Sequence, residues 1–188
     1  MNPVMSGERI CLYQASQLEV VLDHMAWQAA GFLTQKQKIM VVGILRRGAP
    51  LANMIYQRLT NHFGIGNIAL MNLEIKRYAD DLTLLHPETK LTEDPSQFKL
   101  DLSDTTILVV DDVMFRGHSM LRAVEYLARK GAVEIRTMVL VDRGANKLPV
   151  RVDISGVRLD VAPPDIVECN VPPYEEAFKI ELFKPSIN

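Results

Sequence analysis

The sequence predicts an α/β fold with an open parallel sheet flanked by helices. Short stretches rich in Ile and Val alternate with stretches of helical spacing, which is typical of strands joined by helical crossovers. Several of these strands end in polar residues and a glycine, where open parallel sheets place their ligands. With 188 residues, 48% hydrophobic and 23% charged, the chain can bury one substantial core. We therefore expect a single domain over residues 1–188.

The first half of the chain predicts a helix, a strand, a helix and a strand. Ser16 and Glu19 have the spacing of a capping box, an apolar stripe follows, and Gly31 is a suitable end for the first helix. Residues 38–45 predict a buried strand, and an apolar stripe of helical spacing follows it. Residues 68–75 predict the next strand.

The second half continues the alternation and ends in a different pattern. Residues 76–99 are charged and polar with two prolines, which predicts a long flexible loop or an extended hairpin. A strand over 105–110, a helix over 120–130 and a strand over 134–141 follow. Residues 158–188 hold five prolines and only short apolar alternations, so we expect a divergent C-terminal segment.

Composition restricts the class of protein. A formal net charge of -2 provides no global attraction to nucleic acid, so any such site would be a local basic patch. Cys11 and Cys169 are far apart and have no metal-ligand spacing, which favours a reducing compartment. No signal sequence and no apolar run of membrane-spanning length is visible. We expect a cytoplasmic protein without a membrane partner.

Residues 105–119 carry the strongest functional signal. An apolar strand ends in Asp111 and Asp112, and after three residues the loop Arg116–Ser119 leads into a helix. Carboxylates at a strand end can accept hydrogen bonds from sugar hydroxyls, and backbone N–H groups at a helix N-terminus can hold a phosphate. The segment predicts a sugar-phosphate site. By itself, the same pattern also occurs in α/β proteins that bind other ligands.

Two more strand ends carry polar residues. Arg46 and Arg47 lie between a strand and a helix, where they could bind a dianionic leaving group such as pyrophosphate, and Gly48 would allow close backbone approach. A solvated basic turn explains this pair equally well in isolation, and its position beside the phosphate loop favours the site. Asp142 and Arg143 follow another buried strand.

Together these segments resemble the type I phosphoribosyltransferases, in particular the PyrR-like regulators of pyrimidine operons that are also uracil phosphoribosyltransferases. The family's pyrophosphate loop, Val-Gly-Ile-Arg/Lys-Thr-Arg-Gly, corresponds to 42–48. Its Tyr-Arg-Asp-Asp-Leu loop corresponds to 78–82. Its Val-Leu-Val-Asp-Arg-Gly and Leu-Pro-Ile-Arg-Ala-Asp segments correspond to 139–144 and 148–153. The resemblance spans roughly residues 10 to 160.

The resemblance implies conversion of uracil and 5-phosphoribosyl pyrophosphate to UMP and pyrophosphate, with a small hood over the sheet. It assigns Asp111, Asp112 and Arg47 to catalysis. Magnesium would be held weakly by the two aspartates and mostly by substrate oxygens. The implied site for phosphoribosyl pyrophosphate comprises Arg46, Arg47, Gly48, Asp111, Asp112, Phe115, Arg116, Gly117, His118 and Ser119.

The resemblance also implies how the base is held. Asp142 and Arg143 would line the base pocket, and Tyr78 and Asp80 would lie on a loop that closes over the site. Purine enzymes with this motif carry an acid at the position of Phe115, where it can handle a ring proton. Phenylalanine cannot do so, which disfavours purines.

Four positions depart from the family pattern. Arg116 replaces a threonine and His118 replaces a basic residue in the phosphate loop. Leu45 replaces the first basic residue of the pyrophosphate loop, and Ala79 replaces an arginine. These departures are compatible with substrate binding and leave the rate of turnover open.

An alternative is a nucleotide-sensing regulator that binds leader RNA and has weak or no catalysis. The resemblance points to a basic surface with His24, Lys147, Arg151 and Arg158, although ordinary surface charges explain these residues equally well. A purine phosphoribosyltransferase is less favoured. The family also implies a homodimer or homotetramer.

Overall fold

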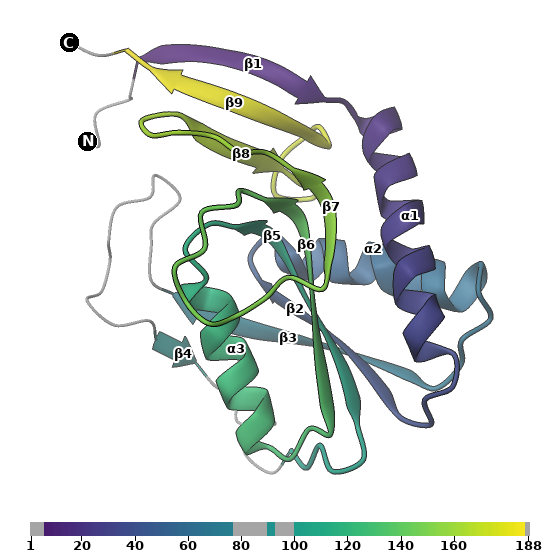
Figure 1. The fold of residues 1–188 in the computed structure, drawn as a ribbon. Coiled ribbons are helices and arrows are strands. Elements are labelled where there is room, and N and C mark those ends of the chain that lie inside the picture. The colour runs from purple at the N-terminus through teal and green to yellow at the C-terminus, as the bar shows by residue number, and fades with distance from the viewer. Residues whose placement is uncertain (1–5, 77–89, 93–99, 187–188) are drawn as a thin grey trace.

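A computed structural model describes residues 6–76, 90–92 and 100–186. Figure 1 shows a larger sheet flanked by helices and a smaller sheet above one end of it. The elements described are β1 (Gly7–Tyr13), α1 (Ala15–Leu33), β2 (Ile39–Leu45), α2 (Gly48–Asn61), β3 (Ile68–Lys76), β4 (Lys90–Thr92), β5 (Thr106–Met114), α3 (His118–Arg129), β6 (Glu134–Asp142), β7 (Ile154–Arg158), β8 (Ile166–Asn170) and β9 (Lys179–Pro185).

The larger sheet has the strand order β4-β3-β2-β5-β6-β7, with all neighbours parallel except β3 and β4. Successive side chains of a strand face opposite sides of the sheet. In β5, Leu108 and Val110 therefore pack in the core beneath α1 and α2, while Ile107 and Val109 pack beneath α3. The predicted parallel sheet with helices on both faces is confirmed (Figure 1).

The predicted strands over 38–45, 68–75 and 134–141 are confirmed to within a residue or so. The expectation that the central strand ends before its two acids is wrong, because β5 runs on to Met114. Its last residues stay paired with β6, and Met114 lies opposite Asp142. Continued backbone pairing with a long neighbouring strand outweighs the local polarity of the acids.

The predicted limits of the first helix are also wrong. Helix α1 begins at Ala15, and the backbone N–H of Gln14 donates to Gln17 Oε1 at 3.0 Å, so Ser16–Glu19 does not form the capping box. The helix passes Gly31 and ends at Leu33, which is fully buried. Burial of this last apolar residue extends the helix beyond a glycine that would locally favour a stop.

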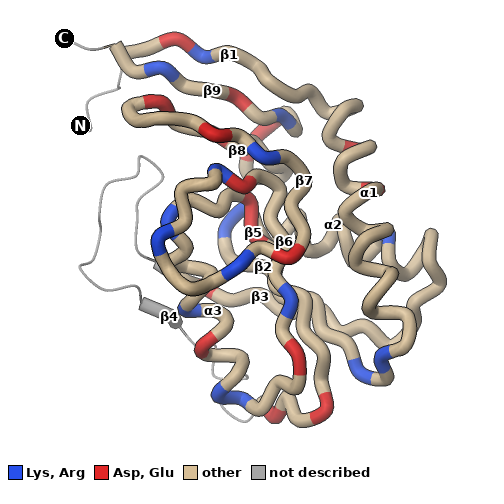
Figure 2. Tube along the Cα trace, viewed as in Figure 1, with Lys and Arg blue, Asp and Glu red and all other residues tan. Residues whose placement is uncertain are grey.

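Sequence reasoning missed β1 and most of the C-terminal structure. Strand β9 lies between β1 and β8 and is antiparallel to both, and these three strands form the smaller sheet, called the hood below. The two strands that flank β9 come from opposite ends of the chain, so no local pattern indicates their pairing. The predicted small hood is confirmed, and Figure 2 shows that charges of both signs occur on it.

Part of the segment 76–99 falls outside the described residues. Strand β4 pairs antiparallel with the end of β3, as an extended hairpin would. Tyr78, Ala79 and Asp80 lie outside the described residues, so their expected place on a closing loop stays a prediction. No helix in the described ranges is both long and apolar enough to cross a membrane.

Candidate active site

A cleft of about 910 Å³ lies between the hood and the carboxyl ends of the central strands. Its walls come from the β2–α2 turn, the end of β5, the loop into α3, and strands β8 and β9 of the hood. Segments far apart in the sequence therefore meet at the edge of the sheet where open α/β folds bind ligands (Figure 1).

Asp111 and Asp112 form the floor of this cleft at the end of β5. Asp111 Oδ1 accepts the backbone N–H of Asp112 at 2.9 Å, and Asp112 Oδ1 accepts that of Val113 at 2.8 Å. Burial raises the pKa of Asp111 well above its usual range, and the neighbouring Asp112 charge adds to the rise. Burial also raises the pKa of Asp112, although the charge of Arg47 opposes it. Hydroxyl donors or a cation would stabilise this acid pair.

Gly48 brings the start of α2 against these acids. A Cβ atom at this position would lie 2.6 Å from the carbonyl oxygen of Val110 and 3.1 Å from the Cα of Asp111. Only glycine fits this contact without moving backbone. Arg47, directly before the helix, is thereby placed beside the acid pair and lines the cleft.

The two arginines of the β2–α2 turn contact the hood. Arg47 donates to Glu175 Oε1 from Nη2 at 2.5 Å and from Nε at 3.0 Å, and Glu175 Oε2 accepts the N–H of Val171 at 2.8 Å. Burial opposes ionisation of Glu175, but the hydrogen bonds from Arg47 and Val171, together with the charges of Arg47 and Arg46, outweigh it, so the pKa of Glu175 is lowered. The guanidinium of Arg46 lies 5.0 Å from the ring centre of Tyr174. No motif in the sequence pointed to Glu175 or Tyr174.

The predicted phosphate loop lines the opposite side of the cleft. Gly117 precedes α3 with a φ of 87°, a left-handed conformation that glycine adopts at little cost. A Cβ atom here would also collide with Asn146 Oδ1. His118 and Ser119 begin the helix and line the cleft. The first turn of α3, whose N–H groups have no carbonyl partner within the helix itself, thus lies at the wall of the cleft.

Arg143 and Phe115 form one wall. The Arg143 guanidinium is stacked 4.5 Å from the Phe115 ring centre, and Nη2 donates to the carbonyl oxygens of Val161 and Asp165 at 3.1 Å each. Arg143 is only 5% exposed, and burial lowers its pKa. Its Nε has no hydrogen-bond partner among the described residues. This buried donor at the cleft wall suits a ligand oxygen.

Asp142 and Arg143 were predicted together in the base pocket, but in the structure only Arg143 lines the cleft. Asp142 is not among the cleft-lining residues in the described part of the chain, and its carboxylate accepts the N–H of Gly144 at 2.9 Å. The hood contributes residues that the sequence did not indicate. Glu168, Asn170 and the buried Glu181 line the cleft, and Asn170 donates to Glu181 at 2.8 Å.

Three of the four departures from the family pattern lie in the cleft. Leu45, Arg116 and His118 line it, and the Leu45–Arg46 peptide bond is cis. Arg116 is exposed, with its guanidinium 5.3 Å from the Phe115 ring centre. The cationic side chain thus lies at the mouth of the predicted phosphate site.

The basic residues predicted for RNA lie outside this cleft. His24 is stacked on Trp27, with ring centres 5.7 Å apart, and Trp27 is 62% exposed. Trp27 and Arg151 line a second hollow of about 560 Å³, whereas His24, Lys147 and Arg158 are not among its lining residues in the described part of the chain. Of the four predicted residues, Arg151 therefore lies at this hollow, and His24 is connected to it through the ring of Trp27.

Comparisons with known proteins agree with this geometry. The family model described as the phosphoribosyl transferase domain matches residues 11–177. The bifunctional protein PyrR of Haemophilus influenzae is 33% identical over 147 residues, covering 77% of this chain and 81% of that protein. The bifunctional protein PyrR of Thermosynechococcus vestitus is 31% identical over 188 residues, covering 97% and 98%.

Solved structures show the same fold at low identity. A hypoxanthine-guanine phosphoribosyltransferase from Bacillus anthracis has a TM-score of 0.70 at 13% identity, covering 96% of this chain and 99% of that one. A hypoxanthine phosphoribosyl transferase from Trypanosoma cruzi has a TM-score of 0.75 at 13% identity, covering 98% and 94%. The resemblance inferred from the motifs is confirmed, and the chain belongs to the phosphoribosyltransferase family, with PyrR proteins among its relatives.

Proposed function

We propose that this protein is a uracil phosphoribosyltransferase that converts uracil and 5-phosphoribosyl pyrophosphate to UMP and pyrophosphate. The observation that carries the proposal is one cleft holding Asp111, Asp112, Arg47 and the N-terminus of α3. The two aspartates match a ribose, Arg47 matches a pyrophosphate, and the N-terminus of α3 matches a 5-phosphate. Relatives named PyrR support the same class of substrate.

The chemistry needs charge stabilisation more than proton transfer. The bond between the ribose C1 and pyrophosphate breaks, a bond to the uracil N1 forms, and the N1 proton is released. Asp111 and Asp112 would hold the ribose hydroxyls and stabilise positive charge developing on the sugar. Arg46 and Arg47 would stabilise the departing pyrophosphate. Positioning and electrostatics would supply most of the rate enhancement.

The acid pair also fits a magnesium ion that takes most of its ligands from substrate. Magnesium usually binds one or two carboxylates together with phosphate oxygens and water. Within the described ranges, no group of three or more His, Cys, Asp or Glu side chains could hold a metal ion. When bound, the ion would neutralise charge on the pyrophosphate, while Asp111 and Asp112 would orient it.

Phe115 and Arg143 support a pyrimidine base. Phe115 offers no acid or base for a purine ring proton. The buried, unpartnered Nε of Arg143 can donate to a carbonyl oxygen, and uracil has two. The carboxylate of Asp142 accepts the backbone N–H of Gly144, which makes Asp142 a weaker candidate for base contact.

The test is pyrophosphate release with uracil, hypoxanthine, guanine and orotate offered in parallel. We expect turnover with uracil and about tenfold less or lower with each other base, since a buried polar group that is left unpaired costs about 1–3 kcal/mol. Preference for hypoxanthine or guanine would contradict the assignment of the base. Absence of turnover with all four would favour the regulatory alternative.

A second proposed function is recognition of leader RNA. His24, Trp27 and Arg151 place an exposed aromatic ring and a cation on one surface, a combination that stacks and holds single-stranded bases. Charges of both signs along the chain argue against broad attraction to nucleic acid (Figure 2). Loss of RNA binding in Trp27→Ala, with turnover unchanged, would support this function.

We also expect the protein to form a homodimer or a homotetramer, which sedimentation would measure.

A further inference from the structure

Glu175 lies in the turn between β8 and β9, facing the start of α2. Its side chain is 22% exposed, and both carboxylate oxygens are engaged. Oε2 accepts the N–H of Val171 within the same turn, while Oε1 accepts both Nε and Nη2 of Arg47. The carboxylate is therefore held by backbone and presents a fixed acceptor to the guanidinium. Charge-assisted contacts of this kind are strong and directional.

Arg47 lines the same cleft as the acid pair. Gly48, the next residue, brings the start of α2 against the backbone of Val110 and Asp111, so Arg47 has Glu175 as a partner and the acid pair nearby. A long arginine side chain loses rotamer freedom when it is fixed, and this loss opposes binding. If nothing held it, Arg47 could turn onto the acid pair and compete with the ligand. A contact that fixes it beforehand would remove that cost from substrate binding.

We propose that Glu175 is a positioning residue, which holds Arg47 at the leaving-group end of the cleft. The inference rests on the proposed phosphoribosyl transfer, in which Arg47 meets pyrophosphate. It predicts the sign of an effect. By Coulomb's law alone, removal of a carboxylate beside Arg47 strengthens binding of an anion. By positioning, the same removal weakens binding.

The experiment measures binding of inorganic pyrophosphate with magnesium chloride by calorimetry, together with kcat and KM. Glu175→Ala is expected to weaken pyrophosphate binding and lower kcat/KM by about ten- to a hundredfold. Glu175→Gln should restore most of the loss, because its amide oxygen can still accept from Arg47. Glu176→Gln is the matched control, since Glu176 is the adjacent, exposed residue, and it should leave both values unchanged.

A double-mutant cycle separates positioning from stability. In an Arg47→Ala background, Glu175→Ala should cause less than about a twofold further loss, because the residue that it positions is gone. Additive losses, stronger pyrophosphate binding in Glu175→Ala, or a lowered Tm with unchanged binding would each overturn the inference. A wild type that binds pyrophosphate and transfers to no base would refute the proposed function but not the inference. A wild type that does not bind pyrophosphate would refute both.

Discussion

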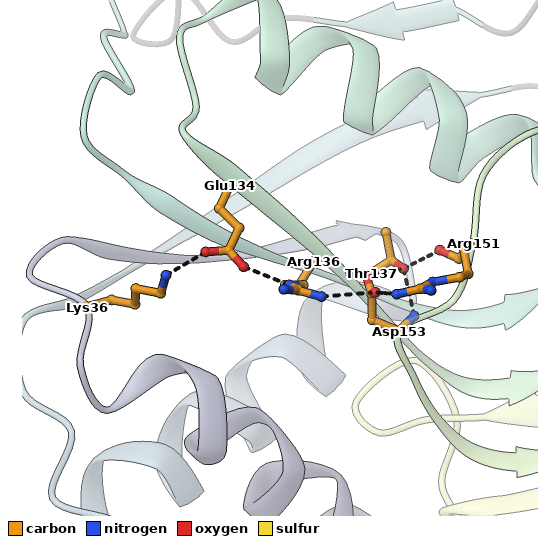
Figure 3. Close-up of polar contacts among 6 residues, drawn as sticks. All are labelled: Lys36, Glu134, Arg136, Thr137, Arg151 and Asp153. Atoms are coloured by element: carbon orange, nitrogen blue, oxygen red, sulfur yellow. Dashed lines mark hydrogen bonds and ion pairs between the residues drawn. The ribbon is translucent and has the colours of Figure 1, made fainter.

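Acidic residues occur at both ends of the central strands, and the two groups differ in how their charge is balanced. Figure 3 shows a network around the start of β6, in which Glu134 accepts from Lys36 at 2.6 Å and from Arg136 at 2.8 Å. Asp153 accepts from Arg151 at 2.8 Å. At the other end of the sheet, Asp111 and Asp112 line the cleft.

The direction of the pKa shifts reports this difference. Hydrogen bonds from Lys36 and Arg136 lower the pKa of Glu134. Burial raises the pKa of Asp153, but hydrogen bonds from Arg151 and Thr137 outweigh it and the net shift is downward. The pKa values of the cleft acids are raised instead. Carboxylates whose negative charge is balanced by cations and donors of the protein stabilise the fold. Carboxylates at a cleft whose charge is not balanced in this way can bind the donors or cations of a ligand.

The largest expected effect comes from removing the cleft charges. Asp111→Asn combined with Asp112→Asn should abolish detectable binding of phosphoribosyl pyrophosphate, because amides cannot match two carboxylates toward hydroxyls and a cation. The folded state raises both pKa values, so ionisation destabilises it at neutral pH. The variant should therefore melt at a higher temperature, by roughly 2–4 °C. Calorimetry and thermal melts check the two expectations. Unchanged affinity would make the acids structural.

The next effect concerns two cleft positions that depart from the family pattern. Restoring the family pattern with Arg116→Thr and Leu45→Arg should raise uracil-dependent pyrophosphate release, up to about a hundredfold. Threonine returns a compact hydroxyl to the phosphate loop, and arginine adds a donor at the leaving group. Steady-state rates of the single and double variants measure this. Lower activity in the double variant would identify Arg116 as a working phosphate ligand.

Gly48→Ala tests whether the acids need α2 close beside them. The new Cβ would lie 2.6 Å from backbone at Val110, so the helix start and Arg47 must move away. We expect kcat/KM to fall by about tenfold or more, since small misplacements at a reacting centre are costly. Helix propensity alone favours alanine over glycine, so it predicts no loss in this variant. An unchanged kcat/KM in Gly48→Ala would contradict the close-approach argument.

The sequence indicated the parts of the cleft that are local in the chain. Asp111, Asp112 and the loop into α3 form one continuous segment, so their pattern predicted both the strand end and the ligand class. Contacts with the hood could not be predicted in this way. Arg47 and Glu175 are 128 positions apart, and their pairing depends on how the hood folds back. The sequence showed a basic turn and left its partner unidentified.

The extent of β5 illustrates a second limit. Two adjacent acids locally favour a loop, but the strand continues because β6 offers pairing as far as Asp142. The role of Asp142 was similarly outside local reasoning. Its carboxylate closes a turn onto Gly144, while the neighbouring Arg143 packs against Phe115. Asp142 and Arg143 are neighbours in one motif, but tertiary contacts place their side chains in different surroundings.

The smallest functional effect is expected at the opposite end of the sheet. Asp153→Asn removes a carboxylate that accepts from Arg151 and from the Thr137 backbone, so the free energy of unfolding should fall by about 1–2 kcal/mol at pH 7. Because the folded state lowers the pKa of Asp153, its stabilisation is fully present above the unfolded value of about 3.9. It is lost as pH falls through the lower folded pKa. Urea titrations at pH 7, 5 and 3 should therefore show a difference in the free energy of unfolding between wild type and variant that persists to pH 5 and narrows by pH 3.

Turnover with uracil should be unchanged in Asp153→Asn, since Asp153 does not line the cleft. A tenfold drop in turnover with stability intact would mean that the paired acids also act on the cleft, and the contrast between the two ends of the sheet would fail.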